Sequence, residues 1–142
     1  MLRSLALCAP FLLIVSLFTG CSPQEKYVTV KGQVVVKGTN GGKLRVEFHP
    51  NAEKGTKGPS SSGITDDEGR FTLTYAQGNK SGEGAIVGWH KVVIFDMRLA
   101  ESETGKGIPI RIPTTYSEVH ATPLDVELLN NNDNLVIDVP KK

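Results

Sequence analysis

The chain of 142 residues has few aromatic side chains, little cysteine and no excess of charge of either sign. Phe, Trp and Tyr make up only 6% of the residues, so the sequence offers little for an extended aromatic binding platform. The 16 basic side chains nearly balance the 15 acidic ones. A neutral chain without a basic stripe is a poor candidate for binding nucleic acid. Of the two cysteines, Cys8 lies in an N-terminal apolar run and only Cys21 follows it, so no disulfide is expected.

The N-terminal apolar run has the pattern of a secretory signal. Arg3 supplies a positive charge, residues 5–18 are mainly apolar, and small residues stand at Thr19 and Gly20. About 20 apolar residues are needed to span a bilayer, and this run is shorter. We therefore expect residues 1–20 to be a cleaved signal peptide, with the cut between Gly20 and Cys21.

The segment Leu17-Phe18-Thr19-Gly20-Cys21 resembles the lipobox of bacterial lipoproteins, with Phe18 where that family most often has Leu. The resemblance implies lipidation of Cys21 by acyl chains such as palmitate, and hence membrane attachment in the cell envelope. Ser22 stands where an inner-membrane retention signal would usually place Asp, which favours the outer membrane facing the periplasm. Residues 21–26 form a short tether. Five extended residues reach roughly 17 Å, so the domain is expected to lie close to the membrane.

Residues 27–140 read as a single domain of short strands. Apolar and polar side chains alternate in residues 28–36, 44–49, 71–75, 124–128 and 135–139, and residues 85–95 form the longest apolar run. Period-two alternation predicts half-buried strands, and a run of apolar residues suits a central strand. We expect the first two segments to pair as one hairpin and the last two as another. Residues 50–62, 77–84 and 100–107 are predicted loops, and a short strand is expected at Gly63–Thr65.

No convincing helix is expected after the signal. Pro109 and Pro113 keep residues 108–114 extended and suit a sheet edge or a crossover. Seven or so short strands in a chain of this size predict an all-β fold, an antiparallel sandwich.

Several segments together resemble the carboxypeptidase regulatory-like, or transthyretin-like, domain. The most specific is Thr65-Asp66-Asp67-Glu68-Gly69-Arg70-Phe71. The others are residues 34–36, 46–50, 88–92 and 112–116. Small bacterial lipoproteins with this domain show the same order of elements. The resemblance covers nearly all of residues 27–139 and implies a seven-stranded Greek-key sandwich. It supplies no activity, since most of these lipoproteins have none established.

Two groups of residues could bind a metal ion. Asp66, Asp67 and Glu68 are consecutive acids beside Gly69, whereas calcium loops draw ligands from spaced positions. A tight turn with Gly69 at positive φ explains them better, and Asp66 and Asp67 stay weak metal candidates. His49, His90 and His120 are scattered without a cysteine or paired carboxylates, which argues against zinc. His90 shares a strand face with Val92 and is expected at the core.

Catalytic motifs are also scarce. No nucleophile elbow or phosphate-binding loop is present, and Ser60, Ser61 and Ser62 are expected in a flexible loop without an adjacent base. The C-terminus lacks the Tyr-Arg-Gly-Ser signature of hydroxyisourate hydrolase, an enzyme of the transthyretin-like fold. We therefore expect no enzyme and no cofactor.

The sequence favours a lipid-anchored envelope protein with a non-catalytic domain in a structural or protein-interaction role. The alternative is a membrane-held carbohydrate-binding module, in which Trp89 and Tyr116 would stack on a sugar. A third possibility is a small hydrolase, which would require a histidine and a carboxylate to meet in a pocket. The expected partners are the membrane, through Cys21, and an envelope protein or polysaccharide.

Overall fold

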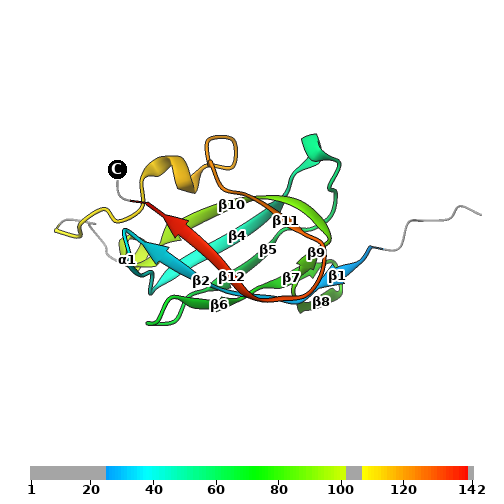
Figure 1. Cartoon of the computed structure of the whole chain (residues 1–142), viewed down its shortest axis with the longest axis horizontal. Coiled ribbons are helices and arrows are strands. Elements are labelled where there is room, and N and C mark those ends of the chain that lie inside the picture. Colours follow the sequence, from blue (N-terminus) through cyan, green and yellow to red (C-terminus); the bar gives the residue numbers. More distant parts are fainter. Residues whose placement is uncertain (1–24, 102–106, 141–142) are drawn as a thin grey trace, which may run out of the picture.

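The computed structural model describes residues 25–101 and 107–140. The predicted signal peptide, Cys21 and most of the predicted tether lie outside these residues. Within them the chain is mostly β, with largely antiparallel sheets (Figure 1). The strands are β1 Tyr27–Val28, β2 Val30–Val36, β3 Thr39–Asn40, β4 Leu44–Pro50, β5 Ser61–Ile64, β6 Arg70–Thr72, β7 Thr74–Gln77, β8 Lys80–Glu83, β9 Ala85–Ile86, β10 Gly88–Asp96, β11 Asp125–Leu128 and β12 Asn132–Val139.

The strands form two larger sheets and a two-stranded ladder of β1 and β9. One sheet has the order β11-β10-β4-β5-β7-β8. The other has the order β12-β2-β3, with β6 also paired to β2. One hydrophobic cluster joins inward-facing residues of both sheets, among them Val34 of β2, Phe48 of β4 and Val92 of β10. The alternation of apolar and polar residues therefore buries one face of each sheet against the other, as an all-β sandwich requires.

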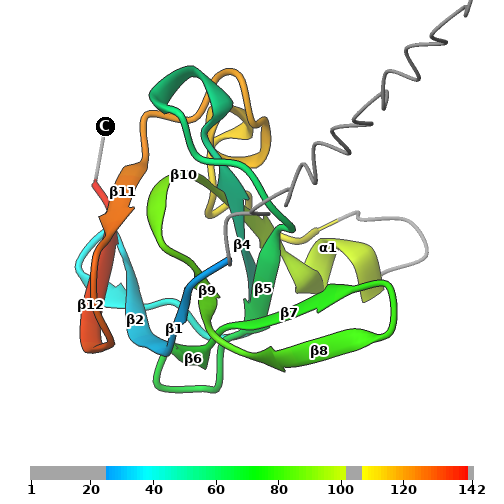
Figure 2. The same ribbon diagram turned by 90° about the vertical axis from the view of Figure 1, so that its right-hand side faces the viewer.

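β10 is an interior strand of the six-stranded sheet, second from its β11 edge, and its apolar run predicts strands on both sides. It pairs with β4 on one side and β11 on the other. Val92 and Val93, on opposite faces of β10, are both fully buried. The end of β10 at Gly88 lies beside the β1–β9 ladder, whereas its other end runs into helix α1 (Met97–Glu101) at the opposite end of the molecule (Figures 1 and 2).

Both predicted hairpins are wrong. β2 and β4 lie in different sheets, as do β11 and β12. After β2, Lys37 and Gly38 adopt positive φ and β3 turns back onto β2, so the chain then crosses to the other sheet. In each case the two strands bury apolar faces against opposite sides of one core, which pairing within one sheet would not allow.

Several smaller predictions also need correction. Residues 80–83, predicted as loop, form β8 and pair with β7. The predicted strand 71–75 divides into β6 and β7, which belong to different sheets. Helix α1 and the 3-10 turns η1 (Ala52–Lys54) and η2 (Thr114–Ser117) occur where no helix was expected. The short strand predicted at residues 63–65 is confirmed in part: β5 spans Ser61–Ile64, so it includes two residues predicted as loop and excludes Thr65. Residues 108–113 precede η2 without a strand.

A buried carboxylate holds the end of β10 to the segment that follows α1. Asp96 accepts hydrogen bonds from the guanidinium groups of Arg98 and Arg111, at 2.8–3.1 Å, and Arg111 also donates to the carbonyl of Gly42. Burial alone would raise the pKa of Asp96, but the hydrogen bonds from Arg111 and Arg98 hold it well below its usual range. This cluster ties Arg98 at the start of α1 and Arg111 before η2 to the end of β10.

Candidate functional site

The acidic segment at Asp66 forms the predicted turn. The Asp66 carboxylate accepts the backbone N–H of Arg70 at 2.8 Å, and its carbonyl accepts the N–H of Gly69 at 3.0 Å. Gly69 has φ +80°, the left-handed conformation that glycine adopts most readily. Both Asp66 and Asp67 are exposed. Within residues 25–101 and 107–140, no three His, Cys, Asp or Glu side chains come together in a way that could hold a metal ion.

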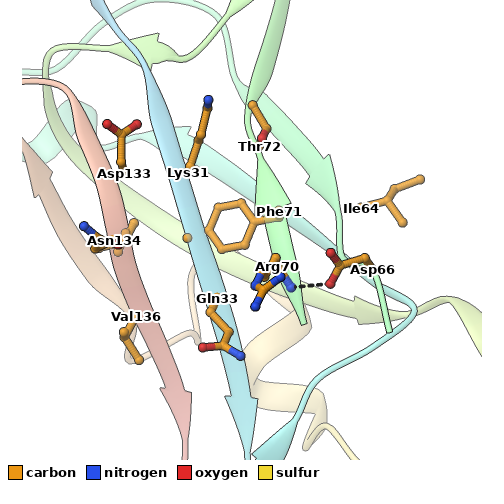
Figure 3. A pocket seen from close by; sticks show the side chains of 12 residues that line it. Lys31, Gln33, Ile64, Asp66, Arg70, Phe71, Thr72, Asp133, Asn134 and Val136 are labelled. Atoms are coloured by element: carbon orange, nitrogen blue, oxygen red, sulfur yellow. Dashed lines mark hydrogen bonds between the residues drawn. The ribbon is translucent and has the colours of Figure 1, made fainter. Parts of the chain in front are cut away.

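Asp66 lies at one margin of a hollow of about 630 Å³ beside β2 (Figure 3). The hollow is lined by charged and polar groups of both signs, including Lys31, Arg70 and Asp133, and Phe71 lies at its floor. Two aliphatic side chains that line it, Ile64 and Val136, are 64% and 63% exposed. Single exposed aliphatic side chains are common on protein surfaces, so this hollow is a candidate contact surface by its shape and not by its apolar content.

His90 is a fully buried core residue, as its position on β10 predicts. Its Nδ1 donates to the carbonyl of Gly88 at 3.1 Å, and its ring packs 5.9 Å from that of Phe48. Its Nε2 has no hydrogen-bond partner within the described part of the chain. Burial lowers the pKa of His90, so the imidazole is neutral near pH 7.

The two aromatic residues proposed for sugar stacking occupy different settings. Trp89 faces away from His90 and is partly exposed, and the Lys54 ammonium lies 3.5 Å from the centre of its ring. Tyr116, in η2, packs against the hydrophobic cluster. The aromatic pairs found among the described residues do not include Trp89 with Tyr116. Aromatic residues that stack on a sugar need not stack on each other, so the carbohydrate-binding alternative stays a prediction.

Lys54 belongs to a charged group beside Trp89 on the same outer face. Its ammonium and that of Lys91 both contact the Asp125 carboxylate, and the Asn51 amide donates to it. Burial alone would raise the pKa of Asp125, but its hydrogen bonds to Lys54 and Asn51 and the charge of Lys91 hold the pKa below its usual value. These contacts fasten η1 to the sheet.

A second group of polar side chains lies across the outer face of β4, and it was not predicted from the sequence. Ser60 Oγ lies 3.0 Å from His49 Nδ1, and His49 Nε2 lies 3.0 Å from Glu47 Oε2. Arg45 Nε approaches Glu47 Oε1 at 2.9 Å, a charge contact without hydrogen-bond alignment. The expectation that no base adjoins the serines of residues 60–62 is therefore wrong. Antiparallel pairing of β4 with β5 sets Phe48 opposite Ser61, which places His49 opposite Ser60.

Cys21 lies outside the described residues, so its surroundings are not part of the structure. Among the described residues no helix has the length and apolar character needed to cross a bilayer. No protein-family model, no curated protein and no solved structure matches this chain.

Proposed function

We propose that this chain is a lipid-anchored protein of the cell envelope, with a β-sandwich domain in a structural or protein-interaction role. The observation that carries the proposal is the sequence Leu17-Phe18-Thr19-Gly20-Cys21 after an apolar run. Acylation of Cys21 by two or more chains gives stable attachment, since each buried CH₂ contributes about 0.8 kcal/mol. The outer membrane facing the periplasm is the proposed location.

For the domain we propose the carboxypeptidase regulatory-like fold, a seven-stranded Greek-key sandwich with additional short strands. Its support is the segment Thr65–Phe71, the most specific part of the resemblance, which forms a tight turn within an all-β two-sheet structure.

The N-terminal end of the domain suits a short tether. Tyr27 stacks on Tyr75 with ring centres 3.9 Å apart, and its hydroxyl donates to Glu25 at 2.9 Å. Burial and the hydrogen bond to Glu25 raise the pKa of Tyr27 to about 12. Tyr27, six residues after Cys21, therefore holds the chain against the domain. Gly88, at the start of β10, lies beside β1, and the other end of β10 lies about 27 Å from it along the strand. Helix α1 follows that other end and would therefore point away from the membrane.

The anchor is tested by metabolic labelling with an alkyne analogue of palmitate and by membrane fractionation. Cys21→Ser should abolish labelling and release the protein or leave it unprocessed. Cys8→Ser changes the chain's other cysteine and serves as the matched control, because it should keep both label and membrane retention. Equal labelling of Cys21→Ser and the native chain would refute the anchor.

The interaction role is tested by photo-crosslinking in intact cells. A crosslinking amino acid at Val136, beside the hollow along β2, should yield a discrete product with an envelope component, and Ile64→Asp should reduce its amount. A chain that gives only uncrosslinked protein from this position would count against an interaction role for this surface.

A further inference from the structure

The hydrogen bonds of His49 determine which ring nitrogen carries its proton. Glu47 Oε2 can only accept when ionised, so His49 Nε2 must donate to it across 3.0 Å. In the neutral imidazole this leaves a lone pair on Nδ1, directed at Ser60 Oγ 3.0 Å away. The Arg45 guanidinium lies on the other side of the Glu47 carboxylate, with Nε 2.9 Å from Oε1. The three groups are therefore arranged as a nucleophile, its base and the residue that orients the base.

We propose that Ser60 is an activated nucleophile toward acyl esters, with His49 as its general base and Glu47 as the positioning residue. In serine hydrolases the same roles are recognised by geometry and not by sequence order. The inference goes beyond the anchored role proposed above and does not depend on it, because it rests only on contacts within the described residues.

The surroundings of Ser60 indicate the kind of ester. Ser60 lines a shallow hollow of about 530 Å³ over β5, β7 and β8. The hydroxyl groups of Ser62, Thr74 and Ser81 also line it, and they can exchange hydrogen bonds with hydroxyl groups of a ligand. An open, hydroxyl-rich hollow suits a small acyl group on a polar alcohol better than a long apolar chain.

The reaction consumes one water for each ester. Ser60 Oγ attacks the acyl carbon while its proton passes to His49 Nδ1. The bond to the leaving alkoxide breaks, and this oxygen takes the proton from His49 to leave as the alcohol. Water then gives a proton to His49 and attacks the acyl-serine, and Ser60 recovers its proton as the carboxylic acid departs. The ring of His49 ends in its starting tautomer.

Solvent access sets the expected rate. His49 and Glu47 have 28% and 21% of their side-chain surface exposed, so water screens the relay more than in a closed active site. We therefore expect the base to contribute about 10²-fold, the low end of the range for general-base catalysis.

The test uses the full chain purified in detergent and a fluorophosphonate probe, which forms a bond between serine Oγ and phosphorus as fluoride leaves. The native chain should be labelled once, and Ser60→Ala should lose the label. Ser117→Ala is the matched control, because Ser117 lies in η2 outside this hollow and its hydroxyl donates to the Thr114 carbonyl, without a histidine contact, and it should stay labelled. No labelling of the native chain, or labelling that survives Ser60→Ala, would overturn the proposal.

The relay is tested separately by hydrolysis of p-nitrophenyl acetate. His49→Asn should lower kcat about 10²-fold, and Glu47→Gln should lower kcat while leaving KM unchanged, with partial recovery in Glu47→Asp. Unchanged far-ultraviolet circular dichroism and thermal midpoints identify variants that still fold. If Ser60 is labelled but folded His49→Asn reacts as fast as the native chain, the assignment of His49 as base is wrong.

Discussion

The Asp96 cluster allows the most direct test of what holds the fold together. Asn in place of Asp96 keeps the size of the side chain but removes its charge and turns one acceptor into a donor. The native carboxylate is 1% exposed and accepts four guanidinium hydrogen bonds of 2.8–3.1 Å, two from Arg98 and two from Arg111. After the substitution both guanidinium groups would lose their counter-charge, and an NH₂ group would face their N–H groups.

The magnitude follows from the burial of the partners. Breaking a buried ion pair by removing one member costs about 3–5 kcal/mol. Arg98 and Arg111 keep 33% and 25% of their side-chain surface exposed, so water recovers part of this loss. We therefore expect Asp96→Asn to lower the free energy of unfolding by about 3 kcal/mol, which for a domain of this size corresponds to a fall of roughly 12 °C in Tm.

Urea unfolding followed by circular dichroism measures this effect, with the denaturant slope as a check on two-state behaviour. Asp138→Asn is the matched control, because Asp138 is exposed on β12 and makes no ion pair among the described residues; it should change stability by less than about 0.5 kcal/mol. A loss below about 1 kcal/mol for Asp96→Asn would refute the reasoning.

The depressed pKa of Asp96 adds a pH signature. Its contribution is complete above the unfolded-state value near 3.9 and is lost as the pH falls toward the folded-state pKa, so the native chain should lose more stability than Asp96→Asn between pH 5 and pH 2.

Two further predictions concern the core and the Asp66 turn. Because burial lowers the pKa of His90, the unfolded chain binds a proton near pH 6.5 that the folded chain excludes, so stability should fall below that pH by up to about 1.4 kcal/mol per pH unit. Urea midpoints measured at pH 7.5 and pH 5.5 should show this fall in stability in the native chain and a smaller fall in His90→Leu. His120→Asn changes an exposed histidine and serves as the control. Equal falls in all three chains would contradict the prediction. Gly69→Ala should destabilise strongly, because a Cβ at φ +80° would stand 2.6 Å from the Val34 carbonyl oxygen. Gly78→Ala, also at positive φ but with open space around it, should cost only about 1–2 kcal/mol, and equal thermal midpoints for the two variants would show that the close approach at Gly69 does not matter.

The faces of the strands could be predicted from the sequence, but their partners could not. Alternation in residues 28–36 and 44–49 indicates which side chains are buried, and Val34 and Phe48 are indeed core residues. A period of two residues carries no information on which strand lies alongside. Both β2 and β4 needed a buried face, and placing them in opposite sheets satisfies this as well as a hairpin would.

The candidate site likewise has one part that could be predicted from the sequence and one part that could not. Glu47 and His49 are two residues apart on one strand, so their shared face could have been predicted from spacing alone. Ser60 joins them only because β5 pairs with β4 in a register that sets Ser61 opposite Phe48. The register of β5 against β4 depends on the whole sheet. The sequence predicts only a loop between these two strands, where the structure has the η1 turn. The Asp66 turn, in contrast, is local and was predicted correctly.

The parallel pairing of β12 with β2 has a consequence for how the chain reaches its native state. The two strands lie at opposite ends of the sequence, and the bond from the Thr29 N–H to the Asn131 side chain that accompanies them spans 102 residues. Closing so long a loop is slow, because its entropy is lost before the contacts form. One edge of β2 therefore stays without its neighbour until the last strand has emerged. A chain cut short before Asn132 would leave that edge of β2 open to pairing with other strands, so β12 covers an edge that would otherwise favour aggregation.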